Sequence, residues 1–181
     1  RRLLAGMLTN GAGCTPTTSM GRLFDAVSSL IGICHEAGYE GQAAIELEAV
    51  VAGLGDVHRC DDVPAMIIDS SNDALVVDPR EVLAALVRDV IDGAPPAQSA
   101  ARFHASVARA VRDVARHVRA DAGLNTVGLT GGVFQNALMT TECARSLVED
   151  GFDVLVHRRV PPNDGGLALG QTMIAACGGG R

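Results

Sequence analysis

The sequence predicts an α/β fold with a helix-rich front half, one β-hairpin and a β-α-β-α tail. Two observations lead to this prediction. In the last third of the chain, short apolar runs alternate with helical patterns, which is typical of parallel strands joined by right-handed crossovers. Earlier in the chain, apolar residues recur at spacings of three and four, as on amphipathic helices. The 181 residues, 48% apolar and 20% charged, fit one domain or the larger part of one.

The front half divides at glycines, prolines and polar stretches. We expect helices at 3–9, 21–31, 42–51, 79–91 and 97–120, and two short strands at 65–69 and 74–77 around a Ser-Ser-Asn turn. Ser19 is expected to cap the second of these helices, because a serine side chain accepts a hydrogen bond from a free N–H group at a helix start. Pro79 suits the first turn of its helix.

The tail places a turn at the end of each of its strands. The strands are expected at 125–129 and 153–157, and the helices at 136–149 and 165–177. Gly131 and Gly132 lie in the first turn, where adjacent glycines let a ligand approach the backbone, and the next helix is expected to offer free N–H groups to an anion. Asp164 lies in the second turn. Because neighbouring parallel strands end at one edge of a sheet, we expect a glycine turn suited to a nucleotide beside a carboxylate suited to a metal.

Composition argues against several classes of protein. A net charge of −6 at pH 7 argues against a dedicated nucleic-acid surface, and we expect one solvated helical stripe from Arg102, Arg109, Arg112, Arg116 and Arg119. No uncharged apolar run approaches the roughly 18 residues of a membrane span, and no signal-peptide pattern is visible. Five scattered cysteines without a C-x-x-C motif suit a reducing cytoplasm, and most are expected to be small buried side chains. The chain begins without Met, so we expect a piece of a longer protein.

Four segments of the chain resemble one family. They are SMGRLFDAVSSLIG at 19–32, YEGQAAIELEAV at 39–50, GGVFQN at 131–136 and HRRVPPNDGGLALGQ at 157–171. In this order they resemble the C-terminal part of HypF-type carbamoyltransferases, hydrogenase maturation proteins whose last domain is related to the tRNA threonylcarbamoyl transferases (the Kae/TsaD family). The resemblance runs from about Leu3 to Ala176. It implies the C-terminal lobe of a two-lobe actin/sugar-kinase/Hsp70-like (ribonuclease H-like) fold, with upstream lobes elsewhere in the parent chain.

The resemblance implies a two-part reaction of the full-length parent. Carbamoyl phosphate and ATP give carbamoyl-adenylate in an upstream domain. The domain represented here then passes the carbamoyl group to the C-terminal cysteine of a HypE-like acceptor protein, which forms a precursor of the cyanide ligands of NiFe hydrogenase. The sequence shows no signature of a serine or cysteine nucleophile, which agrees with such a transfer because it depends on positioning and charge stabilisation.

The resemblance also assigns the residues of the two turns. Asp164 matches an aspartate that binds a metal in the family, and that metal is zinc, iron or magnesium. The other ligands of the metal include two histidines of an H-x-x-x-H helix. No pair of histidines in this chain has that spacing, and from the residues alone Asp164 is equally a helix cap. Gly131, Gly132 and Asn136 match the block that binds the nucleotide or carbamoyl-adenylate. Without the resemblance, a tight turn with an asparagine cap is the alternative.

Three residues of the front half complete the expected site. Asp25, Gln42 and Glu46 match the family positions at which acidic residues hold the ribose hydroxyls, a task that suits a carboxylate. Solvated acids are the alternative. Relative to the tRNA-modifying relatives, this chain is about four residues longer between the two acids, and Gln-Ala replaces Gly-Pro. Glu48 lies one step off the face of Glu46 and is expected to be solvated.

Other polar residues carry weaker predictions. Arg22 is expected to be exposed at the start of its helix rather than bound to phosphate. Arg158 and Arg159 follow a strand, so alternation is expected to place only one of them on each face. One of the two, Arg158 or Arg159, is expected to face the acyl-adenylate or the tail of the acceptor. His104, inside the long helix, is expected to be a packed or surface histidine.

Three alternatives stay open at the level of sequence. A kinase of the same superfamily would use the same nucleotide turn to transfer a phosphoryl group. A small-molecule O-carbamoyltransferase would share the chemistry but use another acceptor. A protein of a different class, a non-catalytic nucleotide-binding or docking module, is the third alternative, because the metal-binding histidines and further strands are missing. The small sheet is expected to expose an edge that pairs with a second copy.

Overall fold

The computed structural model describes residues 2–54, 63–71 and 74–178. Its helices are α1 (Arg2–Asn10), α2 (Met20–Leu30), α3 (Gln42–Ala52), α4 (Arg80–Ile91), α5 (Pro96–Ala122), α6 (Ala137–Glu149) and α7 (Leu167–Gly178). Its strands are β1 (Ile67–Asp69), β2 (Val76–Asp78), β3 (Thr126–Leu129) and β4 (Asp153–Val156), and the 3-10 helices η2 (Gly132–Gln135) and η3 (Asp164–Gly166) follow the strands of the tail. The α/β class is therefore confirmed, and the expected elements are present with small shifts at their ends.

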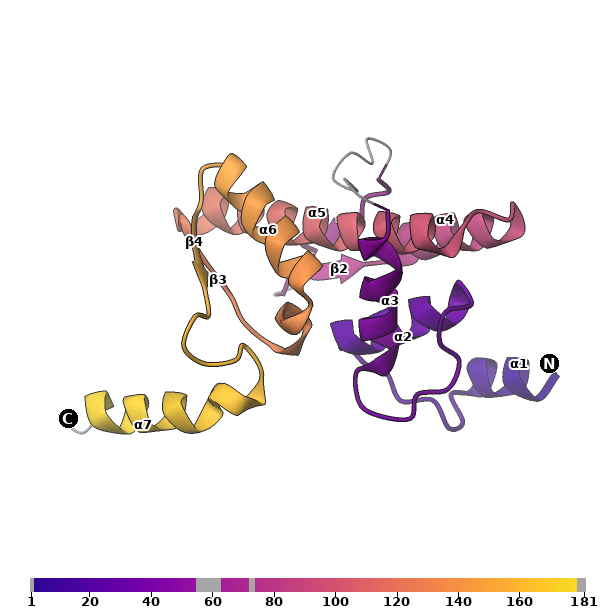
Figure 1. Cartoon of the computed structure of the whole chain (residues 1–181), viewed down its shortest axis with the longest axis horizontal. Helices are drawn as coiled ribbons and strands as arrows, with labels where there is room; N and C mark the ends of the chain where they lie inside the picture. The colour runs from indigo at the N-terminus through magenta and orange to yellow at the C-terminus, as the bar shows by residue number, and fades with distance from the viewer. Residues whose placement is uncertain (1, 55–62, 72–73, 179–181) are drawn as a thin grey trace.

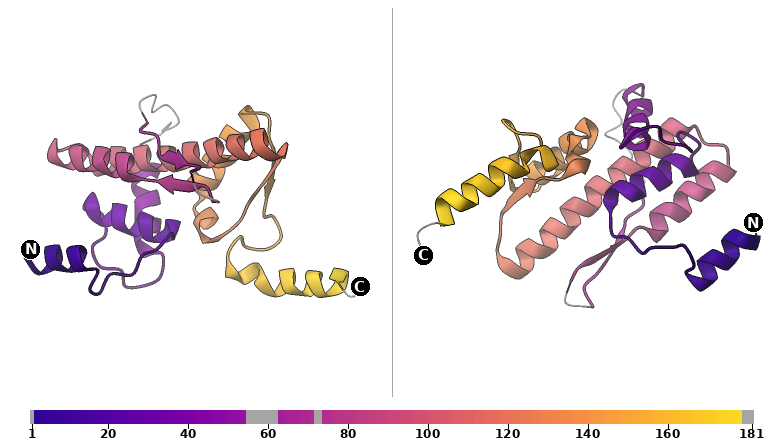
Figure 2. Two further views of the ribbon diagram at one scale, coloured as in Figure 1. Left: turned by 180° about the vertical axis from the view of Figure 1, so that it is seen from behind. Right: turned by 90° about the horizontal axis from the view of Figure 1, so that it is seen from below.

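Helix α5 is the longest element, and α1 and α7 lie apart from it (Figure 1). Helices α3 and α4 contact α5, as does α6, which connects the strands of the tail (Figures 1 and 2). The helix forms because apolar residues recur at helical spacing, among them the buried Phe103 and Val107. It ends at Gly123, whose φ of 68° lies in the left-handed region that glycine adopts readily.

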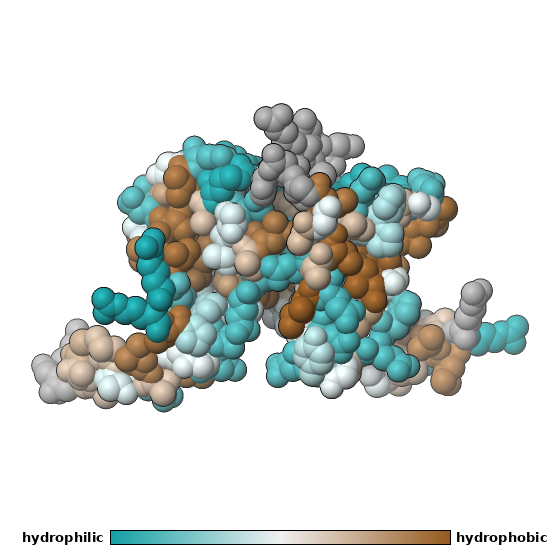
Figure 3. Space-filling model, viewed as in Figure 1, coloured by the Kyte–Doolittle hydropathy of each residue, from teal (hydrophilic) through white to brown (hydrophobic). Residues whose placement is uncertain are grey.

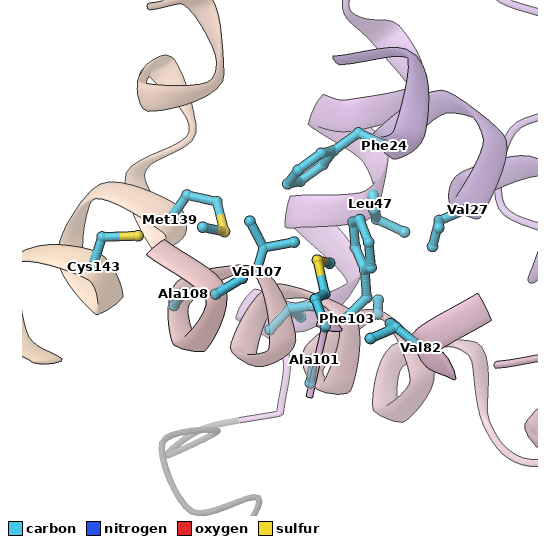
Figure 4. Close-up of a cluster of buried hydrophobic side chains, with 14 of the residues drawn as sticks. Phe24, Val27, Leu47, Val82, Ala101, Phe103, Val107, Ala108, Met139 and Cys143 are labelled. Carbon is cyan, nitrogen blue, oxygen red and sulfur yellow. The ribbon is translucent and has the colours of Figure 1, made fainter. Parts of the chain in front are cut away.

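One hydrophobic core joins the front half to the tail (Figure 4). Phe24 of α2 and Phe103 of α5 pack edge to face, with their ring centroids 4.9 Å apart. Met139 and Cys143 of α6 are fully buried in the same cluster, on the side of Val107 (Figure 4). The front half and the tail are thus held together by the packing of three helices rather than by a linker.

The tail contains the expected parallel pair of strands. Thr126 of β3 lies opposite Asp153 of β4, and Leu129 lies opposite Val156 at the carboxyl end of the pair. Strands β1 and β2 form an antiparallel pair, as the hairpin pattern predicted. Within the described residues each sheet has two strands, so pairing of its edge with a second copy stays a prediction.

The arginines of α5 form the expected solvated stripe only in part, because Arg109 and Arg116 are exposed whereas Arg102, Arg112 and Arg119 are half-buried. Arg102 forms an ion pair with an aspartate of α4. Arg116 donates two hydrogen bonds, of 2.5 and 2.6 Å, to Asp150 at the end of α6. The guanidinium of Arg119 lies over the ring of Phe152, 3.9 Å from its centroid. The polar face of α5 therefore meets acids of its neighbours, and spacing alone could not reveal those partners.

The two terminal helices lie outside the core. Neither α1 nor α7 has a buried residue, and apolar side chains remain on their surfaces at the two lower corners of Figure 3. Cys14 and Cys177 are exposed, so only Cys34 and Cys143, of the four described cysteines, fit the expected buried role. Cys60 lies outside the described residues. No helix in the described ranges is long and apolar enough to cross a membrane.

Candidate functional site

The two turns at the ends of β3 and β4 are joined directly. The N–H group of Gly131 donates a hydrogen bond of 2.7 Å to the carbonyl oxygen of Pro162. The hydroxyl of Thr130 donates to the same oxygen at 3.4 Å and lies 3.1 Å from Nε2 of His157. The prediction that both turns open at one edge of the sheet is confirmed. We call residues 130–133 and 161–164 together the turn pair.

The glycine turn is open to solvent. Gly131 has a φ of 105°, a conformation that side chains rarely adopt, so glycine is required there. Gly132 has an ordinary φ, and a Cβ added at either glycine would enter open space. Within the described part of the chain, no hydrogen bond uses the N–H groups of Gly132 and Val133. A ligand can therefore approach two successive N–H groups at this turn.

The start of α6 is not free, which corrects an expectation from the sequence. Glu48 of α3 accepts hydrogen bonds from the N–H groups of Ala137, at 2.8 Å, and Leu138, at 3.2 Å. The side chain of Asn136 accepts from the N–H group of Met139 at 2.8 Å. These are the first three N–H groups of the helix, so none of them is left for an anion. Glu48, expected to be solvated, is instead half-buried against α6.

Asn136 and His104 form a second part of the same network. His104 is 1% exposed, and its Nδ1 lies 2.8 Å from the carbonyl oxygen of Ala100. A carbonyl only accepts, so Nδ1 carries the proton and Nε2 has a free lone pair. The amide nitrogen of Asn136 lies 3.1 Å from that Nε2 and donates to it. Burial lowers the pKa of His104, which keeps it in the neutral form that this arrangement requires.

The acids of the front half form a separate cluster around Cys34. The amide nitrogen of Gln42 donates a hydrogen bond of 2.7 Å to Glu46, and its oxygen accepts from Gly38 at 2.7 Å. Asp25 pairs with Arg22, one turn away on α2, at 2.8 Å. Burial raises the pKa of the Cys34 thiol, and the carboxylates of Glu46 and Asp25 raise it further. Each of the two acids therefore has a partner on its own helix, and the charges of both act on the same thiol.

Helix α3 connects this cluster to the turn pair. Glu46 bonds to Gln42, whereas Glu48, two residues later, reaches the start of α6. On α2, Phe24 precedes Asp25 and packs against the ring of His104, with the ring centroids 5.4 Å apart. The structure thus places the expected site residues of α2, α3 and α6 on elements that touch each other. Within the described residues, no hydrogen bond or ion pair joins these acids to the glycine turn, so their joint role stays a prediction.

The second turn leaves its carboxylate free. Asn163, not Asp164, caps this turn, because its side-chain oxygen accepts from the N–H group of Gly165 at 3.1 Å. The cap alternative for Asp164 is therefore wrong. Its carboxylate is exposed and has no ion pair or hydrogen bond in the described ranges. A Cβ on Gly165 would lie 2.8 Å from the ring of Pro161, and one on Gly166 would lie 3.0 Å from its carbonyl oxygen. A side chain at Gly165 would therefore force a shift of the Pro161 ring, and one at Gly166 would make a tight contact.

The turn pair does not by itself hold a metal. Among the described residues, no group of three or more His, Cys, Asp or Glu side chains is arranged to bind an ion. Asp164 offers one carboxylate, and a divalent ion needs several ligands for tight binding. The residues present therefore do not fit a complete metal site.

Three remaining predictions can be placed. Ser19 caps α2 as expected, accepting from the N–H group of Arg22 at 3.4 Å, and Arg22 is exposed. Arg158 and Arg159 are both exposed, beyond the end of β4. Strand alternation therefore does not apply to them, because both lie beyond Val156, the last residue of β4.

Comparisons with known proteins agree with each other. Residues 1–171 match the model of a family described as carbamoyltransferase, Kae1-like domain, second subdomain. The chain is similar to the carbamoyltransferase HypF of Rhodobacter capsulatus, with 37% identity over 177 residues and 97% of this chain covered. It is also similar to the probable carbamoyltransferase HypF of Methanocaldococcus jannaschii, with 33% identity over 171 residues and 94% covered. The chain spans only 22% and 21% of these two relatives.

Solved structures give the same result. A crystal structure of full-length HypF in the phosphate- and nucleotide-bound form superposes with a TM-score of 0.79 at 38% identity, covering 87% of this chain and 20% of that one. The crystal structure of the HypF of T. kodakarensis superposes with a TM-score of 0.77 at 25% identity, covering 97% of this chain and 22% of that one.

Proposed function

Because this chain belongs to the HypF carbamoyltransferase family, we propose that it supplies the nucleotide-binding lobe of such an enzyme. In the parent protein, carbamoyl phosphate and ATP give carbamoyl-adenylate, and the carbamoyl group passes to the C-terminal cysteine of a HypE-like acceptor. The lobe corresponds to the C-terminal lobe of a two-lobe actin/sugar-kinase/Hsp70-like fold. The observation that carries this proposal is the turn pair, where Gly131 is bonded to Pro162 and two N–H groups stay open to a ligand.

The proposed transfer needs no nucleophile from this chain. The thiolate of the acceptor cysteine forms a bond to the carbamoyl carbon, the bond from that carbon to the phosphate oxygen breaks, and AMP leaves with the electron pair. The N–H groups of Gly132 and Val133 would donate to the phosphate oxygens and stabilise the charge on the departing AMP. Holding the adenylate and the acceptor in line supplies most of the remaining effect.

The acids of α2 and α3 would hold the ribose. Glu46 is already fixed by Gln42, so one of its oxygens has a set direction. Asp25 is paired with an Arg22 whose side chain is 61% exposed, and a pair exposed to this extent is weak. The Asp25 carboxylate can therefore accept from a ribose hydroxyl without losing a strong partner. Asn136 would complete the site beside the glycine turn.

Asp164 remains our predicted metal ligand in the full-length protein. The other ligands would have to come from outside the described residues, since these do not form a complete site. We therefore derive no step of the reaction through a metal.

The proposal is tested by titrating AMP into the protein by calorimetry. Asp25→Ala and Glu46→Ala should each weaken binding by about tenfold, as expected when a hydrogen bond to a charged group is lost. Glu81→Ala is the matched control, because Glu81 is an exposed acid in the first turn of α4, outside the proposed site. Site variants that bind AMP as tightly as the wild type would refute the assignment. If the folded wild type does not bind AMP, titrating the full-length parent shows whether another lobe is required.

One alternative has a specific observation in its favour. The described residues offer a single free carboxylate at the turn pair and no group of metal ligands, as expected for a nucleotide-binding module without turnover. AMP binding without carbamoyl transfer from carbamoyl-adenylate to an acceptor would support this alternative for the chain alone. ATP hydrolysis without carbamoyl phosphate would instead support the alternative of a kinase of the same superfamily.

A further inference from the structure

The start of α6 is held by a carboxylate from another helix. Glu48 of α3 accepts from Ala137 and Leu138, which lie 89 and 90 residues further along the chain. Hydrogen bonds to a carboxylate are stronger than those between neutral groups, and a negative charge is favourable at a helix start. We propose that Glu48 is a positioning residue that holds the glycine turn at the correct place relative to the ribose-binding acids. This inference rests on the proposed nucleotide site.

The geometry of α3 explains why this residue has that effect. Residues two apart on a helix point to different sides, and here Glu46 bonds to Gln42 of its own helix while Glu48 bonds to the start of α6. The helix that carries one half of the proposed site is thereby bonded to the helix that carries the other half. Asn136, the first residue before α6, follows directly on η2 and the glycine turn. A shift of the α6 start relative to α3 would move the turn together with Asn136.

Glu48 also determines where a phosphate can bind. Its carboxylate accepts hydrogen bonds from the N–H groups of Ala137 and Leu138. Free N–H groups at a helix start would otherwise be able to bind an anion. Its negative charge further opposes a phosphate at that point. The N–H groups of Gly132 and Val133 remain as the donors of this segment that no internal bond uses, within the described residues. Glu48 therefore directs the phosphate to the glycine turn without touching it.

Three variants separate positioning from charge. Glu48→Gln keeps an oxygen acceptor of the same reach, Glu48→Asp keeps the charge but shortens the side chain, and Glu48→Ala removes both. Calorimetry with AMP should give affinities within about threefold of the wild type for Glu48→Gln, and about fivefold or more weaker for Glu48→Asp and Glu48→Ala, the scale of a lost helix cap. Glu81→Gln, at an exposed acid of α4, is the matched control for loss of charge.

The amide NMR spectrum of the free protein provides a readout that does not depend on nucleotide. The resonances of residues 131–138 should move in Glu48→Asp and stay close to the wild type in Glu48→Gln. Unchanged resonances and affinity in Glu48→Asp would overturn the proposal, and so would tighter AMP binding by Glu48→Ala, because Glu48 would then compete with the phosphate. If neither this chain nor the full-length parent binds AMP, the proposed nucleotide site fails, while these resonances still decide whether Glu48 sets the turn.

Discussion

Replacing Asn136 by aspartate should reverse the pH dependence that His104 imposes on stability. In the wild type, His104 is buried, donates through Nδ1 to Ala100 and accepts through Nε2 from Asn136. Its folded pKa is lowered, mainly by burial and against smaller opposing effects of the hydrogen bond to Ala100 and of Glu48, whereas an unfolded histidine titrates near 6.5. Below about pH 6.5 the unfolded chain therefore binds more protons, and stability falls as the pH drops, by up to about 1.4 kcal/mol per pH unit.

The aspartate variant keeps the helix cap but changes the partner of Nε2. One carboxylate oxygen can still accept from Met139, while the other faces Nε2, which now needs a proton. The folded pKa of His104 should rise above that of the unfolded chain. The stability gained from this pair is then complete below about pH 6.5 and is lost as the pH rises through the folded pKa. Between pH 7.5 and 5.5 the variant should gain about 1–3 kcal/mol relative to the wild type.

Urea unfolding followed by far-ultraviolet circular dichroism at pH 5.5, 6.5 and 7.5 measures these slopes. Asn163→Asp is the matched control. Asn163 also caps a helical turn, but in the described residues its side chain forms no hydrogen bond with a buried histidine. Asn136→Ala should cost about 2–4 kcal/mol at pH 7.5, from a lost cap of about 1 kcal/mol and a buried acceptor left unpaired at about 1–3 kcal/mol. An Asn136→Asp variant with the pH slope of the wild type would refute the assigned tautomer and the link between the two side chains.

Two further predictions concern the turn pair and the polar face of α5. Gly131→Ala should lower the melting temperature, because its φ of 105° would cost a side chain about 1–3 kcal/mol, whereas Gly132→Ala should melt like the wild type but bind AMP more weakly, since its methyl group enters the open space in front of the turn. Equal melting temperatures for the two glycine variants would contradict the strain assigned to Gly131.

Asp150→Asn should also lower the melting temperature at pH 7, because hydrogen bonds from Arg116 lower the pKa of Asp150. That stabilisation is complete above the usual aspartate pKa of about 3.9 and is lost as the pH falls through the lower folded value, so melting curves at pH 7 and pH 3 should show the difference between wild type and variant shrinking.

The sequence predicted local features far better than contacts between distant elements. Glycines, prolines and apolar spacing are local signals, and they placed α6 and β4 closely because each element depends on its own residues. The partner of Glu48 lies 89 residues away, and no spacing rule could supply it. His104 looked like an ordinary histidine for the same reason. The cap alternative for Asp164 rests on aspartate being a favoured cap residue, yet Asn163, one residue earlier, accepts the capping hydrogen bond.

The candidate site was predicted in part by the same logic. The meeting of two strand ends follows from parallel pairing, and the structure confirms it through the hydrogen bond between Gly131 and Pro162. The assumption of free N–H groups on α6 failed, because the helix start attracts a carboxylate of the same protein as readily as it attracts a ligand. Glu48 lies two residues after Glu46, an acid of the segment that carries the family resemblance. A second acid at this position is the signal that could have indicated a contact with the start of α6.

The continuous core around α5 has a consequence for folding. Its contacts join residues near positions 24, 103 and 139, so neither half can bury its apolar surface before the chain closes a loop of many residues. Closing such loops costs entropy that is recovered only when the helices dock, so the two halves should unfold in one cooperative step. A chain cut in the Gly-Ala-Pro segment at 93–95 would yield two pieces that each lack order alone and regain helicity when mixed. Helix α7, which has no buried residue, would exchange its amide hydrogens independently of that step.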